Sequence, residues 1–240
     1  MIPQLVYSVS PRSVEDVESL VRTAIGAGYR HIDLTSFPAA APKVARGLGG
    51  VDVFVTVPVS ADEPEAQLAT MRAQLGVERL DLCVLDLAGL GEPAAMTAAW
   101  LRVLKAVHAG GARMAGVRNA TAEQIHQLAD AGSTPAINQV VLNPWTPQPE
   151  LRDLHQRLGI ATGALNPMAR WPELLNEPPV TSIARRLGRT EAQIVTRWHL
   201  QLGTIPTTSP VHAERIVSNA RVFDFELSHA DMAAIATLRR

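Results

Sequence analysis

The feature that most constrains the fold is a regular alternation of short β-rich runs with longer stretches of helical periodicity. Eight such runs, each followed by an amphipathic segment, extend along the 240 residues of the chain. The expected strands are residues 5–9, 31–34, 53–57, 81–85, 114–117, 137–141, 161–164 and 204–206. Eight repeated strand–helix units in a chain of about 250 residues are typical of a closed β/α barrel.

The sequence therefore predicts an α/β protein that folds as a single (β/α)8 TIM barrel, with one domain over residues 1–240. No low-complexity linker divides the chain, and several strands are nearly continuous apolar runs, as in a buried parallel sheet. Because the first strand begins close to residue 1, we expect no N-terminal hairpin. The stretch 87–93 is short, so we also expect short loops around an open, shallow pocket.

Helix starts are indicated by capping boxes, in which a hydroxyl side chain and an acidic or amide side chain three residues later bond each other's backbone amides. The pattern occurs at Ser60 to Glu63, Thr121 to Gln124 and Thr190 to Gln193. The pair Pro178-Pro179 predicts a loop before a helix, because proline disfavours helix at the residue before it.

Composition excludes several classes of function. A net charge of −1 gives no basic face for nucleic acid, and no apolar run reaches the roughly 18 residues of a membrane span. The single cysteine, Cys83, lies in an apolar run and is expected to be a buried, inert thiol. The histidines lack metal-ligand spacing, so we expect no metal. We expect a cytoplasmic protein with a small-molecule ligand; the sequence does not indicate its oligomeric state.

Polar residues follow the expected strands at the ends where barrel enzymes place their catalytic groups. They are Asp33, Asp86, Arg118 with Asn119, Asn138 with Gln139, and Asn166. Each has a structural alternative: the carboxylates could accept backbone amides at turns, and asparagine is a common turn residue. Arg118 and Asp86 follow neighbouring strands and are expected either to pair or to act separately.

Several motifs resemble those of the aldo-keto reductases. Residues 28–38, G-Y-R-H-I-D-L-T-S-F-P, resemble the family motif G-Y-R-H-I-D-T-x-x-x-Y. Residues 116–119 (G-V-R-N) are similar to G-V-S-N, and residues 135–144 are similar to P-x-x-N-Q-x-x-x-H-P. Further similarity runs through residues 187–227. The resemblance implies a barrel that passes hydride from NADPH to a carbonyl, while a Tyr tuned by a Lys and assisted by a His supplies the proton.

The same resemblance shows which of those catalytic residues are replaced. Pro38 stands at the Tyr position, Pro58 at the Lys position and Asp86 at the His position. Only Asp33 of the family's four catalytic residues remains, and its implied role is to support the missing Lys. Classical carbonyl reduction is therefore expected to be lost.

The implied cofactor site is partly retained. Asn119 and Gln139 match residues that hold the nicotinamide carboxamide, and the resemblance places Arg215 and Asn219 near the adenosine end. Against binding, Leu165 replaces an aromatic ring that would stack on the nicotinamide, Thr207 replaces a Lys near the 2′-phosphate, and Arg118 replaces a Ser. We expect NADPH binding to be weak or absent.

Three hypotheses for function follow. The first is non-redox chemistry on a small molecule, with Asp33 and Asp86 as catalytic acid and base and Arg118, Trp145 and Asn166 binding the substrate. The second is a pseudoenzyme that binds a ligand or partner without catalysis. The third is a residual NADP-dependent oxidoreductase with an unusual proton donor. The sequence does not rank the first two.

Overall fold

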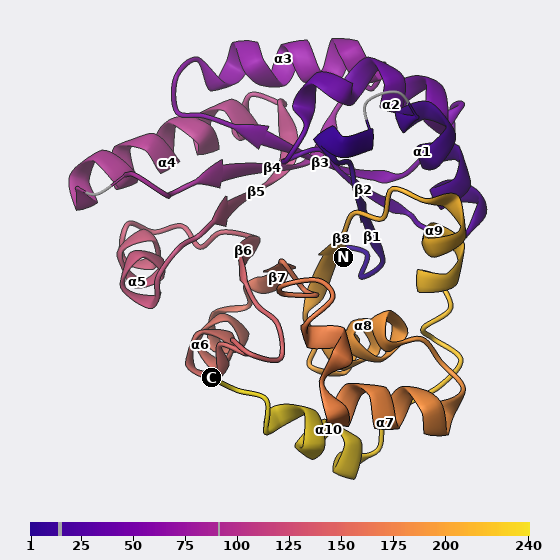
Figure 1. Cartoon of the computed structure of the whole chain (residues 1–240). Helices are drawn as coiled ribbons and strands as arrows, with labels where there is room; N and C mark the ends of the chain where they lie inside the picture. Colours follow the sequence, from indigo (N-terminus) through magenta and orange to yellow (C-terminus); the bar gives the residue numbers. More distant parts are fainter. Residues whose placement is uncertain (14–15, 91) are drawn as a thin grey trace.

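The computed structural model describes residues 1–13, 16–90 and 92–240, and its centre is a closed barrel of eight parallel strands (Figure 1). Each strand pairs with the next in sequence, and β8 pairs with β1 to close the barrel. The strands are β1 Val6–Ser8, β2 His31–Asp33, β3 Phe54–Val59, β4 Leu80–Asp86, β5 Ala112–Arg118, β6 Ile137–Val141, β7 Ala161–Leu165 and β8 Ile205–Thr208. Every expected strand overlaps an observed one, and the predicted (β/α)8 barrel is confirmed.

Helices surround the strands, with α1, α2 and α9 on one side of the barrel and α7, α8 and α10 on another (Figure 1). The described helices are α1 Val17–Gly26, α2 Ala41–Leu48, α3 Pro64–Leu75, α4 Pro93–His108, α5 Ala122–Asp130, α6 Pro149–Leu158, α7 Pro178–Leu187, α8 Glu191–Gln201, α9 Ala213–Asn219 and α10 His229–Ala236. Short 3-10 turns are η1 Pro11–Ser13, η2 Pro38–Ala40 and η3 Leu174–Asn176.

The loop between β4 and α4 contains Gly91, which lies outside the described residues. The expectation of a short loop over residues 87–93 therefore stays a prediction. No described helix combines the length and the apolar character needed to cross a bilayer.

Two of the three predicted capping boxes are present. The Thr121 and Thr190 side chains each accept from the amide three residues later, and the glutamine at that position bonds back to the cap. The box predicted at Ser60 is wrong: α3 begins only at Pro64, and the amide of Ser60 instead donates to Gln67 Oε1 at 3.0 Å. The residue before Pro64 is pushed out of helical geometry by the proline ring, which moves the helix start past the expected cap.

Two other helix starts differ from the sequence-based expectation. Pro178 and Pro179 form the first turn of α7, not a loop before it, because the first helical positions need no amide donor. Ser228 caps α10 in a reciprocal box with Asp231 that the sequence reading did not identify.

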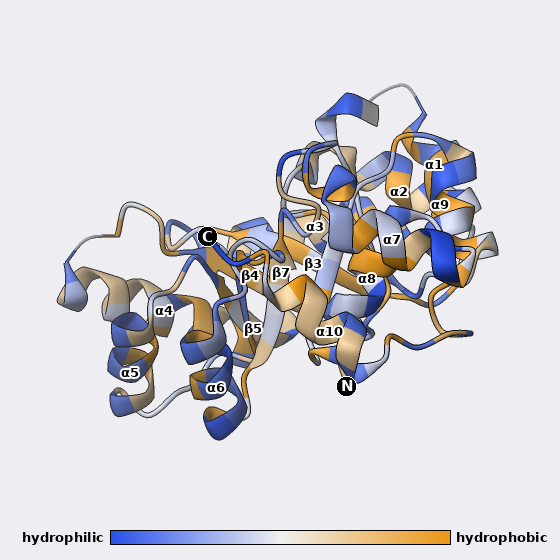
Figure 2. Ribbon diagram, turned by 60° about the horizontal axis from the view of Figure 1, so that its bottom comes forward, coloured by the Kyte–Doolittle hydropathy of each residue, from blue (hydrophilic) through white to orange (hydrophobic). Residues whose placement is uncertain are grey.

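Hydrophobic residues gather toward the centre of the molecule, around β3, β4 and α8, while the outer faces of the helices are more hydrophilic (Figure 2). Inside the barrel, Val6, Leu82, Val84, Ile137 and Ile205 pack together, with Ile2 beside them. Gly116 of β5 leaves room for this cluster, since a Cβ there would lie 2.4 Å from Ile137 Cγ2. The barrel is thus filled by apolar side chains below the level of its mouth.

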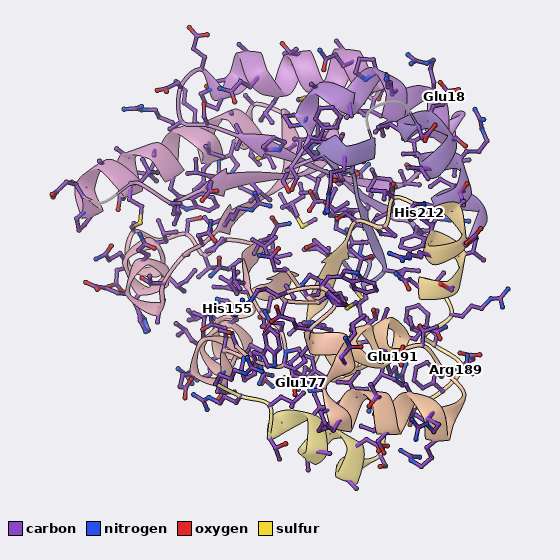
Figure 3. All side chains as sticks on the ribbon, viewed as in Figure 1. Glu18, His155, Glu177, Arg189, Glu191 and His212 are labelled. Atoms are coloured by element: carbon purple, nitrogen blue, oxygen red, sulfur yellow. The ribbon has the colours of Figure 1, made fainter. Side chains whose placement is uncertain are left out.

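Asn138 faces away from the barrel interior and holds the helix layer. Its Nδ2 donates to the carbonyl of Ala120 at 2.9 Å and to His155 Nε2 at 3.1 Å. His155, which lies on α6 beside the barrel (Figure 3), donates from Nδ1 to Thr162 Oγ1 at 2.8 Å. The expectation that Asn138 belongs to the rim is wrong, because alternate residues of a strand point to opposite faces and its neighbour Gln139 takes the inward position.

Burial of His155 produces a pH-dependent contribution to stability. Desolvation lowers the pKa of His155 to about 4, so the folded protein holds this ring neutral. The unfolded chain, with a histidine pKa near 6.5, binds the proton first as the pH falls. We expect the free energy of unfolding to decrease as pH is lowered from about 6.5 toward 4, and to decrease less steeply in His155→Gln. Urea unfolding at pH 7.5 and pH 5 measures this difference.

His108→Gln is the matched control, because His108 is exposed on α4. It should show the same pH dependence as the unmodified protein. If His155→Gln lost as much stability on acidification as the unmodified protein, the burial of His155 would not be the cause.

Candidate functional site

A hollow of ≈ 250 Å³ opens at the carboxyl ends of the strands, where the sequence predicts the functional residues. It is lined by Ser8, Asp33, Thr35, Ser36, Asp86, Arg118, Asn119, Val141, Leu165, Asn166, Thr207 and Ser209. The parallel arrangement brings these residues together, because every strand ends on the same side of the barrel. Five predicted site residues meet here: Asp33, Asp86, Arg118, Asn119 and Asn166.

Asp33 is fully buried at the end of β2, and both of its carboxyl oxygens accept hydrogen bonds. Oδ1 accepts from the Thr35 amide at 2.7 Å and from the Thr35 hydroxyl at 2.5 Å. Oδ2 accepts from Gln139 Nε2 at 2.9 Å. A buried carboxylate is costly unless it is hydrogen-bonded, and an aspartate that bonds the amide two residues later is a common turn device. Thr35 and Gln139 therefore fix Asp33 in place.

Arg118 extends from the end of β5 across the mouth to the segment after β2. Its Nη2 donates to Thr35 Oγ1 at 3.1 Å, and its Nε is shielded from solvent without a partner among the described residues. The sequence left open a pairing between Arg118 and Asp86, whose Cα positions are neighbours in the β4–β5 register. The structure instead joins Arg118 to Thr35, and through this hydroxyl to Asp33.

Asp86 is the solvent-exposed carboxylate of the hollow. Its Oδ1 accepts from the amide of Ala88 at 2.9 Å and from Asn119 Nδ2 at 3.0 Å. Asn119 adopts a left-handed backbone conformation, with φ of 60°, and its amide donates to the carbonyl of Gln139 at 2.8 Å. Both contacts use Oδ1 of Asp86, and among the described residues Oδ2 has no hydrogen-bond donor.

The opposite wall is partly apolar. Val141 at the end of β6 is 41% exposed, and Leu165 ends β7 beside it in the β6–β7 register. Asn166 follows with a φ of 48°, and its carbonyl accepts from Asn143 Nδ2 at 3.3 Å. Thr207 turns its hydroxyl back to the carbonyl of Ala164 at 2.8 Å.

The sequence reading missed two residues on which this arrangement depends. Thr35 joins Asp33 to Arg118, and a hydroxyl two residues after an aspartate was the available signal. Gly163 lies beside Gln139, where an added Cβ would lie 2.8 Å from Gln139 Cγ. That close approach is a tertiary contact between β6 and β7 and leaves no mark in the local sequence.

Trp145 lies outside the hollow, which corrects the expectation that it contacts the substrate. Its indole Nε1 donates to Glu177 Oε1 at 3.0 Å, and the guanidinium of Arg240 stacks on its ring at 4.1 Å. Glu177 is labelled in Figure 3 just before α7, and Arg240 Nη2 also reaches it at 2.6 Å. Trp145 therefore anchors the C-terminal residues.

The two residues predicted at the adenosine end lie on α9, beyond the residues that line the hollow. Arg215 is exposed, and its guanidinium stacks on the ring of Trp171 at 5.1 Å. Asn219 is half-buried at the end of the helix.

Among the residues that the structure describes, no group of three or more His, Cys, Asp or Glu side chains is placed to hold a metal ion. Cys83 is buried, and burial raises its pKa to about 12.

Comparison with known proteins gives consistent matches. The model of the family described as the Aldo/keto reductase family matches residues 41–240. An aldo-keto reductase of Mycolicibacterium smegmatis is 39% identical over 249 residues, which cover 99% of this chain and 90% of that protein. The aldo/keto reductase structure from Brucella melitensis is 30% identical with a TM-score of 0.87, covering 99% of this chain and 95% of that one. The structure of Bombyx mori aldo-keto reductase in complex with NADP is 26% identical with a TM-score of 0.89, covering 99% and 89%.

The Thr35 hydroxyl is expected to stabilise the mouth of the barrel. Thr35→Val keeps the shape of the side chain but removes the donor to Asp33 and the acceptor for Arg118. We expect the free energy of unfolding to fall by about 1.5–3 kcal/mol, the scale for losing a hydrogen bond to a charged group. Urea denaturation measures it. Thr35→Ser keeps the hydroxyl and should lose much less; an equal loss in both variants would exclude the hydroxyl as the cause.

Proposed function

Because this chain belongs to the aldo-keto reductase family, we propose that it retains the barrel's small-molecule site but has lost classical NADPH-dependent carbonyl reduction. In its place, the hollow performs non-redox proton-transfer chemistry on a small molecule. One observation carries this proposal: the described residues that line the hollow include two carboxylates and a guanidinium, but no Tyr, Lys or His.

The positions of the replaced residues support the loss of reduction. Pro38 begins the turn η2 and Pro58 lies in β3, and neither side chain can give or take a proton. The two tyrosines of the chain, Tyr7 and Tyr29, are both buried in the core, with their rings edge to face at 6.1 Å. Burial raises the pKa of Tyr29, so it does not substitute for the missing acid.

The two carboxylates have different roles in the proposed reaction. Asp86 is exposed, and among the described residues only its Oδ1 is hydrogen-bonded, so it takes a proton from a bound molecule and returns it. Asp33 is buried with both oxygens bonded, and it acts through Thr35 to hold Arg118. In this proposal Asp33, expected from the sequence to be catalytic, is a positioning residue. Arg118 and Asn166 face the bound molecule.

The residues present fit a nicotinamide dinucleotide poorly. Gln139 Oε1 is buried without a partner among the described residues, and it would suit an amide group. However, Arg118 stands at the position where the family resemblance places a small Ser, and its side chain crosses the mouth to Thr35. Leu165 provides no aromatic ring on which a nicotinamide could stack. The Thr207 hydroxyl at the family's Lys position bonds Ala164 and carries no charge. We therefore propose that NADPH binds weakly.

Removing Arg118 is expected to improve dinucleotide binding. In a fluorescence titration, the unmodified protein should bind NADPH with a dissociation constant weaker than the low micromolar range. Arg118→Ser should bind at least about fivefold more tightly, because the mouth is then open. Arg113→Ser, on an exposed residue of the same strand β5, should leave binding unchanged. Low-micromolar binding by the unmodified protein would contradict the proposed loss of the cofactor.

The proton-transfer role of Asp86 is tested by hydrogen exchange at carbon. A panel of small carbonyl compounds, including 2-oxobutanoate and butanone, is incubated with the protein in D2O without cofactor. The carboxylate of Asp86 removes a proton next to the carbonyl, and the resulting enolate takes deuterium from solvent. Proton NMR should show exchange above the buffer rate, reduced at least about 100-fold in Asp86→Asn, the usual scale of general acid–base catalysis. Asp62→Asn, on an exposed carboxylate of the β3–α3 loop, is the control.

Two outcomes would support the alternatives. Absence of exchange across the panel would favour a non-catalytic pseudoenzyme that uses the hollow for binding alone. Carbonyl-dependent oxidation of NADPH by the unmodified protein would favour a residual NADP-dependent oxidoreductase.

A further inference from the structure

Arg118 has more hydrogen-bonding capacity than its surroundings satisfy. A guanidinium carries five N–H donors, and the hydrogen bond described for Arg118 runs from Nη2 to Thr35. Its Nε is shielded from water and has no partner among the described residues. Within that part of the chain no carboxylate forms an ion pair with Arg118, although Asp33 and Asp86 line the same hollow. Its remaining donors are available to an anionic ligand.

The charges around Arg118 favour a monoanion over a dianion. One guanidinium and two carboxylates line the hollow, so a second negative charge on a ligand would be repelled without a second cation to offset it. A carboxylate also matches the planar fork of a guanidinium, which binds two oxygens with parallel hydrogen bonds. The chemistry that fits is therefore a carboxylate and not a phosphate dianion.

The size and walls of the hollow limit the rest of the ligand. Its volume of ≈ 250 Å³ holds roughly eight water-sized groups, at about 30 Å³ for each. Val141 and Leu165 provide an apolar wall, while Asp86 and Asn119 provide polar groups. A molecule of about six to eight non-hydrogen atoms, with a short apolar part, fits this space.

We propose that the hollow is a binding site for a small monocarboxylate, held by Arg118 through its carboxylate and by Val141 and Leu165 through its apolar part. Thr35 orients the guanidinium, and Asp33 behind it keeps Thr35 in place. The proposal rests on the proposed function only in identifying the same hollow as the site, and it names the substrate class: a short carboxylic acid that presents an exchangeable proton to Asp86.

Butanoate is the probe that tests this site. In titrations of isotope-labelled protein followed by NMR at pH 7.5, butanoate should cause saturable shifts. Butanamide, its neutral isostere, and ethyl phosphate, which is mostly a dianion at this pH, should each bind at least tenfold more weakly. These three ligands test the charge requirement on the unmodified protein. Equal binding of butanoate and butanamide, or no saturable binding of butanoate, would overturn the proposal.

Two arginine variants on the same strand locate the site. Arg118→Gln should weaken butanoate binding at least tenfold and leave butanamide unchanged. Arg113→Gln, which alters an exposed arginine paired with Asp81, should bind butanoate as the unmodified protein does. Unchanged binding by Arg118→Gln would place the carboxylate elsewhere and reject the proposal. If Arg118→Gln does not fold, as judged by circular dichroism, the comparison of the three ligands decides alone.

The ligand titrations and the NADPH experiments test different properties of the hollow. Charge-independent binding of butanoate would reject the monocarboxylate site and leave the Asp86 exchange result standing. Tight NADPH binding or carbonyl reduction would reject the proposed loss of redox chemistry, while butanoate binding that depends on Arg118 would still support the monocarboxylate site.

Discussion

The mouth of this barrel depends on the burial of one carboxyl group. Asp33 has no exposure to solvent, and removing such a group from water is unfavourable unless donors replace the lost water. Those donors come from Thr35 and Gln139, and the same Thr35 hydroxyl accepts from Arg118. The position of the guanidinium in the hollow therefore follows from the need to satisfy Asp33, and the chemical character of the hollow follows from the guanidinium.

Closure of the barrel makes this network possible. Asp33 and Gln139 are 106 residues apart in sequence, and Arg118 and Thr35 are 83 residues apart. They meet because parallel strands of a closed sheet all direct their carboxyl ends to one rim, above an interior filled with apolar side chains. The fold fixes where these side chains lie, and their identities decide which chemistry they can perform.

The sequence predicted those features that local pattern determines. All eight strands were found from their apolar runs, and Thr121 and Thr190 were found as caps, because a capping box involves residues only three apart. Features set by tertiary contact escaped it. Trp145 was expected in the pocket, but its indole found Glu177 and Arg240 from distant segments. Nothing in the sequence distinguished the neighbouring amides Asn138 and Gln139. Successive side chains of β6 point to opposite faces of the sheet, so Asn138 faces the helix layer and Gln139 faces the barrel interior.

The residues around Asp33 differ from the aldo-keto reductase motifs that they resemble in where the positive charge lies. The resemblance implies that a Lys at the position of Pro58 would be the cation beside Asp33. In this chain the pairing of β3 with β2 ends at Thr56, so Pro58 removes no hydrogen bond between these two strands. Arg118, which the resemblance aligns with a small Ser, supplies a cation from β5 instead. Relative to the motifs of that resemblance, the positive charge therefore lies on the other side of the mouth and on a longer side chain. A guanidinium stays protonated near neutral pH and therefore takes no part in proton transfer. In the proposed function, Arg118 keeps Asp33 in a favourable environment through Thr35 and makes the hollow an anion-binding site instead of a proton-relay site.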